Sequence, residues 1–152
     1  VASRWGNITD FMDFDLLTPN EREARFSLAD QDSTVGRLAG NLQEITRCKS
    51  LILKLGERGV FTLSSKDKNC TSNFFAIDSF ANHVVDAVGS GDALLAYATL
   101  AMLSSDSEAI ATILGSMAAA CECEIDGNVP IKPGDVMAKI DSIEKIAEFN
   151  SA

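Results

Sequence analysis

The sequence predicts an α/β fold in which a mainly parallel sheet is flanked by helices in layers. Short apolar segments of strand length alternate with longer segments whose apolar residues recur at helical spacing. Such alternation is typical of layered α/β proteins. The chain has 152 residues, of which 46% are hydrophobic, so it is long enough to bury a core. We therefore expect residues 1–152 to form a single domain.

The first part of the chain is expected to hold one short strand and two helices. Residues 14–17 are a strand candidate, and Pro19 then disfavours helical backbone just before it. Asn20 is a suitable N-cap for a helix that runs to about residue 29. A second helix is predicted over residues 34–47. Its apolar face is formed by Val35, Leu38, Leu42 and Ile45.

The middle of the chain is rich in strand signals. Residues 50–55 form an apolar run that predicts a buried strand, and residues 56–59 contain two glycines that indicate a turn. A further strand is predicted over residues 60–64, and another over residues 74–77. Residues 66–73 are polar and are expected to be a loop.

The last part of the chain is predicted to be helical. Residues 93–103 are almost wholly apolar, and the serine-rich break at residues 104–107 offers good N-cap residues for a helix over residues 108–121. A loop with prolines follows over residues 127–133, and a closing helix is expected over residues 135–149. The apolar residues in phase along that closing helix are Val136, Ile140, Ile143 and Ile146.

Charge and apolar patterning narrow the classes of partner. The chain has 13 basic and 22 acidic residues, a formal net charge of −9, which disfavours binding to nucleic acid or to an anionic membrane. A nucleotide remains a suitable ligand, because backbone amides and a magnesium ion can hold phosphates without a basic surface. The longest apolar run, residues 93–103, is too short to span a bilayer.

The cysteines indicate a reducing compartment. Cys121 and Cys123 lack the C-x-x-C spacing of zinc or redox sites, and Cys48 and Cys70 lie far from them in sequence. We expect thiols that are reduced, buried or incidental. No signal segment is visible at the start of the sequence, so the protein is expected to be soluble and cytoplasmic.

The most informative segment is residues 86–92, Asp-Ala-Val-Gly-Ser-Gly-Asp, just before the apolar helix. Gly89 and Gly91 allow a tight turn whose amides approach a ligand closely. A helix start attracts anions, and a carboxylate there, Asp92, is well placed to deprotonate a hydroxyl that attacks a phosphate. The alternative is structural: Asp92 caps a buried helix, and the glycines only permit the turn.

Three segments resemble, in order, the motifs of one enzyme family. Residues 86–92 resemble the D-T-x-G-A-G-D signature of the PfkB/ribokinase family of carbohydrate kinases, with Ala87 and Ser90 replacing the usual threonine and alanine. Residues 17–23, LTPNERE, resemble its T-P-N-x-x-E segment, and residues 55–60, LGERGV, resemble its L-G-x-x-G turn between two strands. The matches correspond to the C-terminal half of such a kinase, with the N-terminal part missing. Within the family, residues 17–24, LTPNEREA, are most similar to heptose-phosphate kinases.

The resemblance implies a ribokinase-like fold and a role in ATP-dependent phosphorylation of a sugar or sugar phosphate. It implies that Asp92 is the catalytic base and that the amides of Gly89, Ser90, Gly91 and Asp92 form the anion hole. Asn20 and Glu23 match the residues that organise Mg²⁺, usually through water. For these two, helix capping and a solvated first-turn charge are the structural alternatives.

Further residues are implied at the nucleotide and cation sites. Gly56 and Gly59 match the turn that passes along the nucleotide, although glycine is also common in ordinary hairpins. Ser116 stands where the family often has an asparagine near the adenine, and Gly127 lies in a loop that helps close the site. The backbone at Asp86 would lie near a monovalent cation such as K⁺, and its side chain could orient the turn.

Two other functions stay open at this stage. In this family the sugar is gripped mainly by the N-terminal half, so the chain could be a nucleotide-binding or oligomerisation half-domain without catalysis. It could also be a kinase of a nucleoside or a vitamin precursor. Loss of neighbouring strands would expose a sheet edge and apolar surface, which favours a homo-oligomer.

Overall fold

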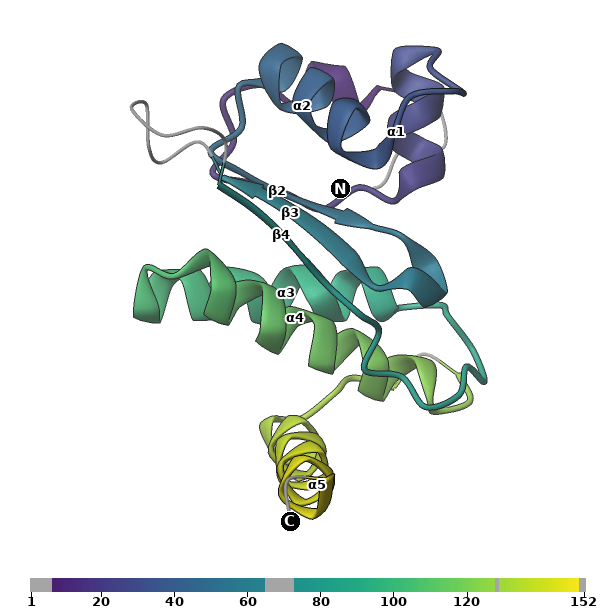
Figure 1. The fold of residues 1–152 in the computed structure, drawn as a ribbon, viewed down its shortest axis with the longest axis vertical. Coiled ribbons are helices and arrows are strands. Elements are labelled where there is room, and N and C mark those ends of the chain that lie inside the picture. Colours follow the sequence, from purple (N-terminus) through teal and green to yellow (C-terminus); the bar gives the residue numbers. More distant parts are fainter. Residues whose placement is uncertain (1–6, 65–72, 128, 151–152) are drawn as a thin grey trace. The chain divides into compact units, whose positions relative to one another are not determined.

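The computed structural model describes residues 7–64, 73–127 and 129–150. These residues form two compact units that divide after Ser79. The first unit contains a sheet and two α-helices, and the second contains three α-helices (Figure 1). The predicted polar loop at residues 66–73 lies, except for its last residue, outside the described residues, as does Cys70.

The sheet of the first unit is mixed. Its strands are β1 (Leu16–Leu17), β2 (Ser50–Lys54), β3 (Val60–Ser64) and β4 (Asn73–Ile77), in the order β1-β2-β3-β4. β1 pairs with β2 in parallel, whereas β2–β3 and β3–β4 are antiparallel. The expectation of a mainly parallel sheet is therefore wrong for this part of the chain. The reason is connection length: a parallel neighbour needs a long crossover, and the turn between β2 and β3 is too short for one.

The crossover from β1 to β2 consists of α1 (Glu21–Leu28) and α2 (Val35–Thr46). A 3₁₀ turn, η1 (Ile8–Asp10), precedes β1, and another, η2 (Gly56–Arg58), joins β2 to β3. α1 begins after its predicted N-cap, Asn20, and α2 begins after Thr34, the first residue of the predicted second helix. Thr34 accepts a hydrogen bond from the Arg37 N–H at 3.4 Å, and Ala29 ends α1 in the left-handed conformation.

The core of the first unit lies between the two helices and the sheet. Leu38 and Leu42 of α2 are fully buried in one cluster with Leu51, Leu53 and Leu63 of the strands. Burial of each such side chain stabilises the fold by about 2 kcal/mol.

The predicted apolar face of α2 is shifted by one residue at its end. Ile45 is 44% exposed, and Thr46 is fully buried. The Thr46 hydroxyl donates to the Leu42 carbonyl at 2.8 Å, which satisfies its polar group inside the core.

The second unit is built on a helical hairpin of α3 (Ser90–Ser105) and α4 (Glu108–Cys123). Asp106 turns the chain with φ 52°, and the hydroxyl of Ser107, the N-cap of α4, accepts from the Ile110 N–H at 3.3 Å. Gly115 lets the helices approach closely, because a Cβ there would lie 2.9 Å from the Leu94 carbonyl oxygen.

The closing helix, α5 (Pro133–Asn150), packs on α4 through Val136, Met117 and Ala118. Ile140 and Ile143 join this cluster as predicted, but Ile146 is 60% exposed. Free thiols are found at Cys48, Cys121 and Cys123 among the described cysteines. Within the described ranges, none of the helices is both long enough and apolar enough to cross a membrane.

A half-buried ion pair ties α5 to the end of α4. Lys139 is 7% exposed and donates to Glu124 Oε1 at 2.6 Å, and the Asn82 N–H donates to the same oxygen at 2.8 Å. We predict that Lys139→Met lowers the free energy of unfolding by about 2 kcal/mol, because it leaves the half-buried Glu124 carboxylate without its counter-charge. Urea denaturation measures this change. Adding Glu124→Gln to the Lys139→Met variant should recover part of the lost stability. If Lys139→Met unfolds with the same free energy as wild type, the ion pair does not stabilise the fold.

The same pair predicts a pH dependence. Burial raises the pKa of the Glu124 carboxyl, but the bonds from Lys139 and the Asn82 amide outweigh it, so the pKa lies below its ordinary 4.5. A lowered folded-state pKa stabilises the fold above the unfolded value, and this stabilisation is lost as the pH falls through the folded value. The free energy of unfolding should therefore decrease when the pH is lowered past about 4.5. This decrease should be less steep in Lys139→Met.

Candidate functional site

Asn20 and Glu23 meet at the start of α1 in a reciprocal capping box. The Glu23 N–H donates to Asn20 Oδ1 at 2.8 Å, and the Asn20 N–H donates to Glu23 Oε2 at 2.8 Å. The capping alternative is thus confirmed for Asn20, while Glu23 is a half-buried capping partner rather than a solvated charge.

The capping box leaves oxygen atoms available as ligands of the kind that magnesium prefers. Glu23 has a second carboxylate oxygen, Oε1, and an amide oxygen such as Asn20 Oδ1 has two lone pairs. No group of three His, Cys, Asp or Glu side chains suited to a metal occurs in the described part of the chain. Magnesium binds with few carboxylates and several waters, so the residues fit an ion held mostly through water and substrate phosphates.

The Gly56–Gly59 turn lies beside the start of α1. The Lys54 N–H donates to the Pro19 carbonyl at 2.9 Å, and Asn20 forms a parallel bridge with Lys54. Within the turn, the Leu55 N–H donates to the Gly59 carbonyl at 2.8 Å.

The two positions of this turn differ in how strictly they require glycine. Both have positive φ, 65° at Gly56 and 80° at Gly59. A Cβ at Gly59 would lie 2.0 Å from the Ile77 carbonyl oxygen, whereas one at Gly56 would meet nothing within 4 Å. Gly59 is therefore required by packing against the end of β4, and Gly56 faces open space.

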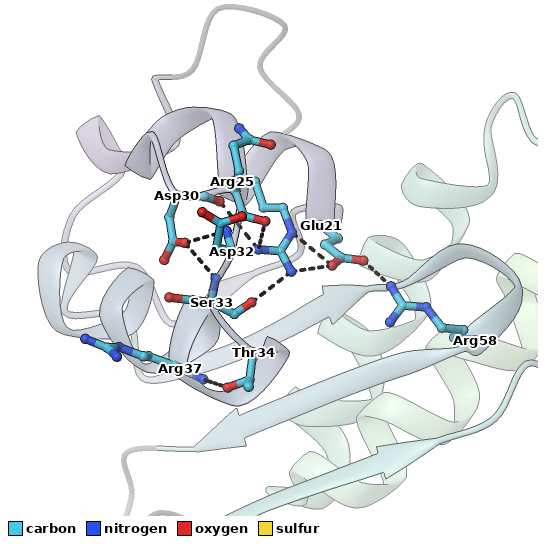
Figure 2. A network of polar contacts seen from close by, with 9 residues as sticks. Glu21, Arg25, Asp30, Asp32, Ser33, Thr34, Arg37 and Arg58 are labelled. Carbon is cyan, nitrogen blue, oxygen red and sulfur yellow. Dashed lines mark hydrogen bonds and ion pairs between the residues drawn. The ribbon is translucent and has the colours of Figure 1, made fainter.

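A polar network that the sequence analysis missed joins this turn to α1 (Figure 2). Glu21 accepts from Arg25 Nε at 3.0 Å and Nη2 at 2.8 Å, and it also pairs with Arg58 of the turn. The Glu21–Arg25 spacing of four residues is a helical ion-pair signal that the sequence contains. The link from Glu21 to Arg58 spans 37 positions and has no local signal.

The second unit holds the glycine turn predicted to bind phosphate. Gly89 is the N-cap of α3 with φ 88°. The Ser90 N–H donates to the Ala87 carbonyl at 3.4 Å, and the Asp92 N–H donates to the Gly89 carbonyl at 2.9 Å. Those two amides are therefore engaged within the turn. Among the described residues no acceptor is found for the amides of Gly89 and Gly91, so they are the donors that remain at the helix start.

The two aspartates of this segment play different parts. Asp86 Oδ1 accepts from the Val88 N–H at 2.9 Å, so its side chain orders the turn as predicted. Asp92 is exposed in the first turn of α3, and no described residue forms a hydrogen bond or ion pair with its carboxylate. Since Gly89 is the N-cap and no side chain caps the helix, the interpretation of Asp92 as a cap is wrong.

Ser116 and Gly127 lie apart from that turn in sequence. Ser116 is buried in α4, and its hydroxyl has no hydrogen-bond partner among the described residues. Gly127 has φ 81° and open space where a Cβ would be. The structure thus brings Asn20 and Glu23 together with the Gly56–Gly59 turn in the first unit. Asp86, the glycine turn, Ser116 and Gly127 belong to the second.

Comparison with known proteins points to the same family as the three sequence motifs. Several solved kinases are similar in structure. Ribokinase from Thermotoga maritima is 26% identical with a TM-score of 0.70, and the match covers 84% of this chain and 42% of that one. Arabidopsis thaliana ribokinase in complex with ribose and ATP is 20% identical with a TM-score of 0.69, covering 88% and 42%. Phosphofructokinase-2 from Escherichia coli in complex with potassium is 16% identical with a TM-score of 0.76, covering 91% and 44%.

The chain therefore spans about two fifths of the length of these kinases, and it shares their ribokinase-like fold. No curated protein matches the sequence significantly. The sequence model of the pfkB family carbohydrate kinases matches residues 7–130, most of the chain. The protein belongs to the pfkB family of carbohydrate kinases.

Proposed function

We propose that this protein supplies the nucleotide site and the catalytic base for transfer of a phosphoryl group from ATP to a hydroxyl of a sugar or sugar phosphate. The observation that carries the proposal is the start of α3. There the exposed carboxylate of Asp92 stands next to the amides of Gly89 and Gly91, for which the described residues offer no acceptor. A base beside an anion-binding turn is what this transfer requires.

Each residue has a defined task in this proposal. Asp92 accepts the proton of the attacking hydroxyl late in the transfer, which an ordinary carboxylate can do when the transition state is loose. The amides of Gly89 and Gly91 donate to oxygens of the moving phosphoryl group, and the left-handed backbone of Gly89 aims them. Loss of one such donor costs about 3 kcal/mol of transition-state stabilisation.

Asn20 and Glu23 would hold Mg²⁺ through water, and Mg²⁺ would neutralise charge on the phosphates. The capping box fixes both side chains in position before any ligand binds. The Gly56–Gly59 turn, Ser116 and Gly127 would line the nucleotide, with Ser116 requiring its buried hydroxyl to become accessible. The backbone at Asp86 would help hold a cation such as K⁺, in keeping with the potassium in the phosphofructokinase-2 structure.

One observation favours a second candidate. The chain spans about two fifths of the length of the related kinases. It could therefore be a non-catalytic half-domain that binds the nucleotide but does not form a complete sugar site. Its apolar side chains at Leu100 and Leu103 are 65% and 80% exposed, which is compatible with self-association.

An acceptor screen separates these functions. The purified protein is incubated with Mg–ATP, with and without K⁺, and with ribose, fructose 6-phosphate, a heptose phosphate or a nucleoside, and ADP is measured. ADP release that depends on a sugar or sugar phosphate supports the proposal. Release with the nucleoside alone would assign a nucleoside kinase, and ATP binding without any transfer would favour the half-domain.

A further inference from the structure

A series of paired charged side chains connects the Gly56–Gly59 turn to the start of α1. The turn is the proposed nucleotide contact, and the start of α1 is the proposed magnesium site. The series runs from the loop after α1, through Arg25 and Glu21, to Arg58 in the Gly56–Gly59 turn (Figure 2). All of these residues belong to the first unit.

Arg25 is the fixed end of this series. Its side chain is 18% exposed. Nη1 donates to the carbonyls of Asp30 at 3.4 Å and Gln31 at 3.2 Å, and Nη2 donates to the carbonyl of Ser33 at 3.1 Å. The guanidinium is thereby anchored in one orientation, and it holds Glu21 Oε1 through two bonds.

Glu21 is the bridging element. With Oε1 held by Arg25, its Oε2 is left to face Arg58. The bonds from Arg25 and the charges of Arg58 and Arg25 hold the pKa of the Glu21 carboxyl below its ordinary value, against the effect of burial. Its side chain is 21% exposed, so water screens this end of the pair less than in an ordinary surface ion pair.

Arg58 is the exposed end of this series. Its side chain is 60% exposed and rises from an exposed turn whose glycine at position 56 has open space around it. Gly59 packs against the end of β4, so it is the exposed tip of the turn that needs a further contact to fix its position. The backbone contact between Lys54 and Pro19 brings the base of the turn to α1, and the Arg58–Glu21 pair fixes its tip.

We propose that Glu21 is a positioning residue that, through Arg58, holds the Gly56–Gly59 turn against the start of α1 and so preassembles the nucleotide-binding surface. The inference rests on the proposed function for its consequence, a higher affinity for Mg–ATP. The other part of the inference, that the pair orders the turn, does not depend on any ligand.

The ligand-free test is hydrogen exchange of the turn amides. Glu21→Gln and Arg58→Gln should each raise exchange of the Gly59 N–H, which donates to the Gly56 carbonyl, by about threefold to fivefold, as expected for a partly exposed pair. Arg22→Gln is the matched control for Arg58→Gln, because it removes the same positive charge from an exposed position next to Glu21 and should leave the exchange unchanged. Equal exchange in Glu21→Gln and wild type would overturn the proposal.

The functional test is titration with Mg–ATP. Each single variant should weaken binding by about threefold to fivefold, and the double variant no further, because both changes break one link. Arg58→Lys, which keeps a cation facing Glu21, should bind more tightly than Arg58→Gln. If Glu21→Gln binds like wild type while Arg58→Gln does not, Arg58 contacts the phosphates directly and Glu21 does not position it. If wild type does not bind, the proposed function fails, and the exchange result still decides the ordering of the turn.

Discussion

Replacement of Asp92 by asparagine should lower the rate of phosphoryl transfer by about 10²- to 10⁴-fold, the usual contribution of a positioned general base. Asparagine has nearly the same shape but cannot accept the proton of the attacking hydroxyl. Because Asp92 is exposed and no described residue pairs with it, the free energy of unfolding should change by less than about 0.5 kcal/mol. Initial rates with the acceptor found in the screen, together with urea denaturation, measure both quantities.

The control for this variant is Asp141→Asn, which removes the same charge from an exposed position on α5. It should transfer phosphate at the wild-type rate. Turnover within about threefold of wild type in Asp92→Asn would remove Asp92 from the role of base, since the expected loss is far larger. A fall in both rate and stability would instead indicate that Asp92 supports the start of α3.

The largest effect on stability is expected at Gly59. Gly59→Ala places a Cβ 2.0 Å from the Ile77 carbonyl oxygen and 2.7 Å from the Asp78 carbonyl carbon, both backbone atoms that cannot rotate away. It also forces alanine into a conformation with φ 80° and ψ −132°. Strain and overlap together should lower the free energy of unfolding by about 4 kcal/mol.

Gly56→Ala is the matched control in the same turn. Its φ of 65° strains alanine, but a Cβ there meets nothing within 4 Å. We expect a loss of about 1 kcal/mol. Urea denaturation of both variants gives the comparison. Equal losses would mean that the turn relaxes around Gly59 and that contact with the end of β4 does not fix it.

The local features of the fold could be predicted because their causes are local. Asn20 and Ser107 cap helices as expected, since capping depends on a side chain and an amide three residues further on. The order of strands and helices followed from short apolar runs between turn residues. The shift from Ile45 to Thr46 on α2 was not predictable, because a threonine whose hydroxyl bonds within its own helix can replace an apolar residue in the core.

The direction of the strands was the main error in the fold. The two glycines of residues 56–59 predict a turn, and a turn of that length joins antiparallel strands. This local signal determines the strand direction here, against the general expectation for α/β proteins. β1 and β2 are parallel because α1 and α2 provide the crossover that such pairing needs.

The candidate site was predictable as motifs but not as a network. The segments containing Asn20, Gly56 and Asp92 could each be identified from a few adjacent residues. The pairing of Glu21 with Arg58 could not, because it depends on how the β2–β3 turn lies against α1. The engagement of the Ser90 and Asp92 amides within their own turn likewise depends on backbone geometry. The role of the site, the heptose-phosphate subgroup and the single-domain organisation remain predictions.

The central claim is that the glycine turn before α3 binds the phosphates of ATP, and calorimetric titration with Mg–ATP tests it most directly. Wild type and Asp92→Asn should bind with similar affinity, because the base is not needed for binding. Gly91→Val should weaken binding by about tenfold or more, since a branched side chain obstructs the approach of phosphate to the amides of the turn. Equal binding by Gly91→Val and wild type, with all proteins shown to be folded, would contradict the claim.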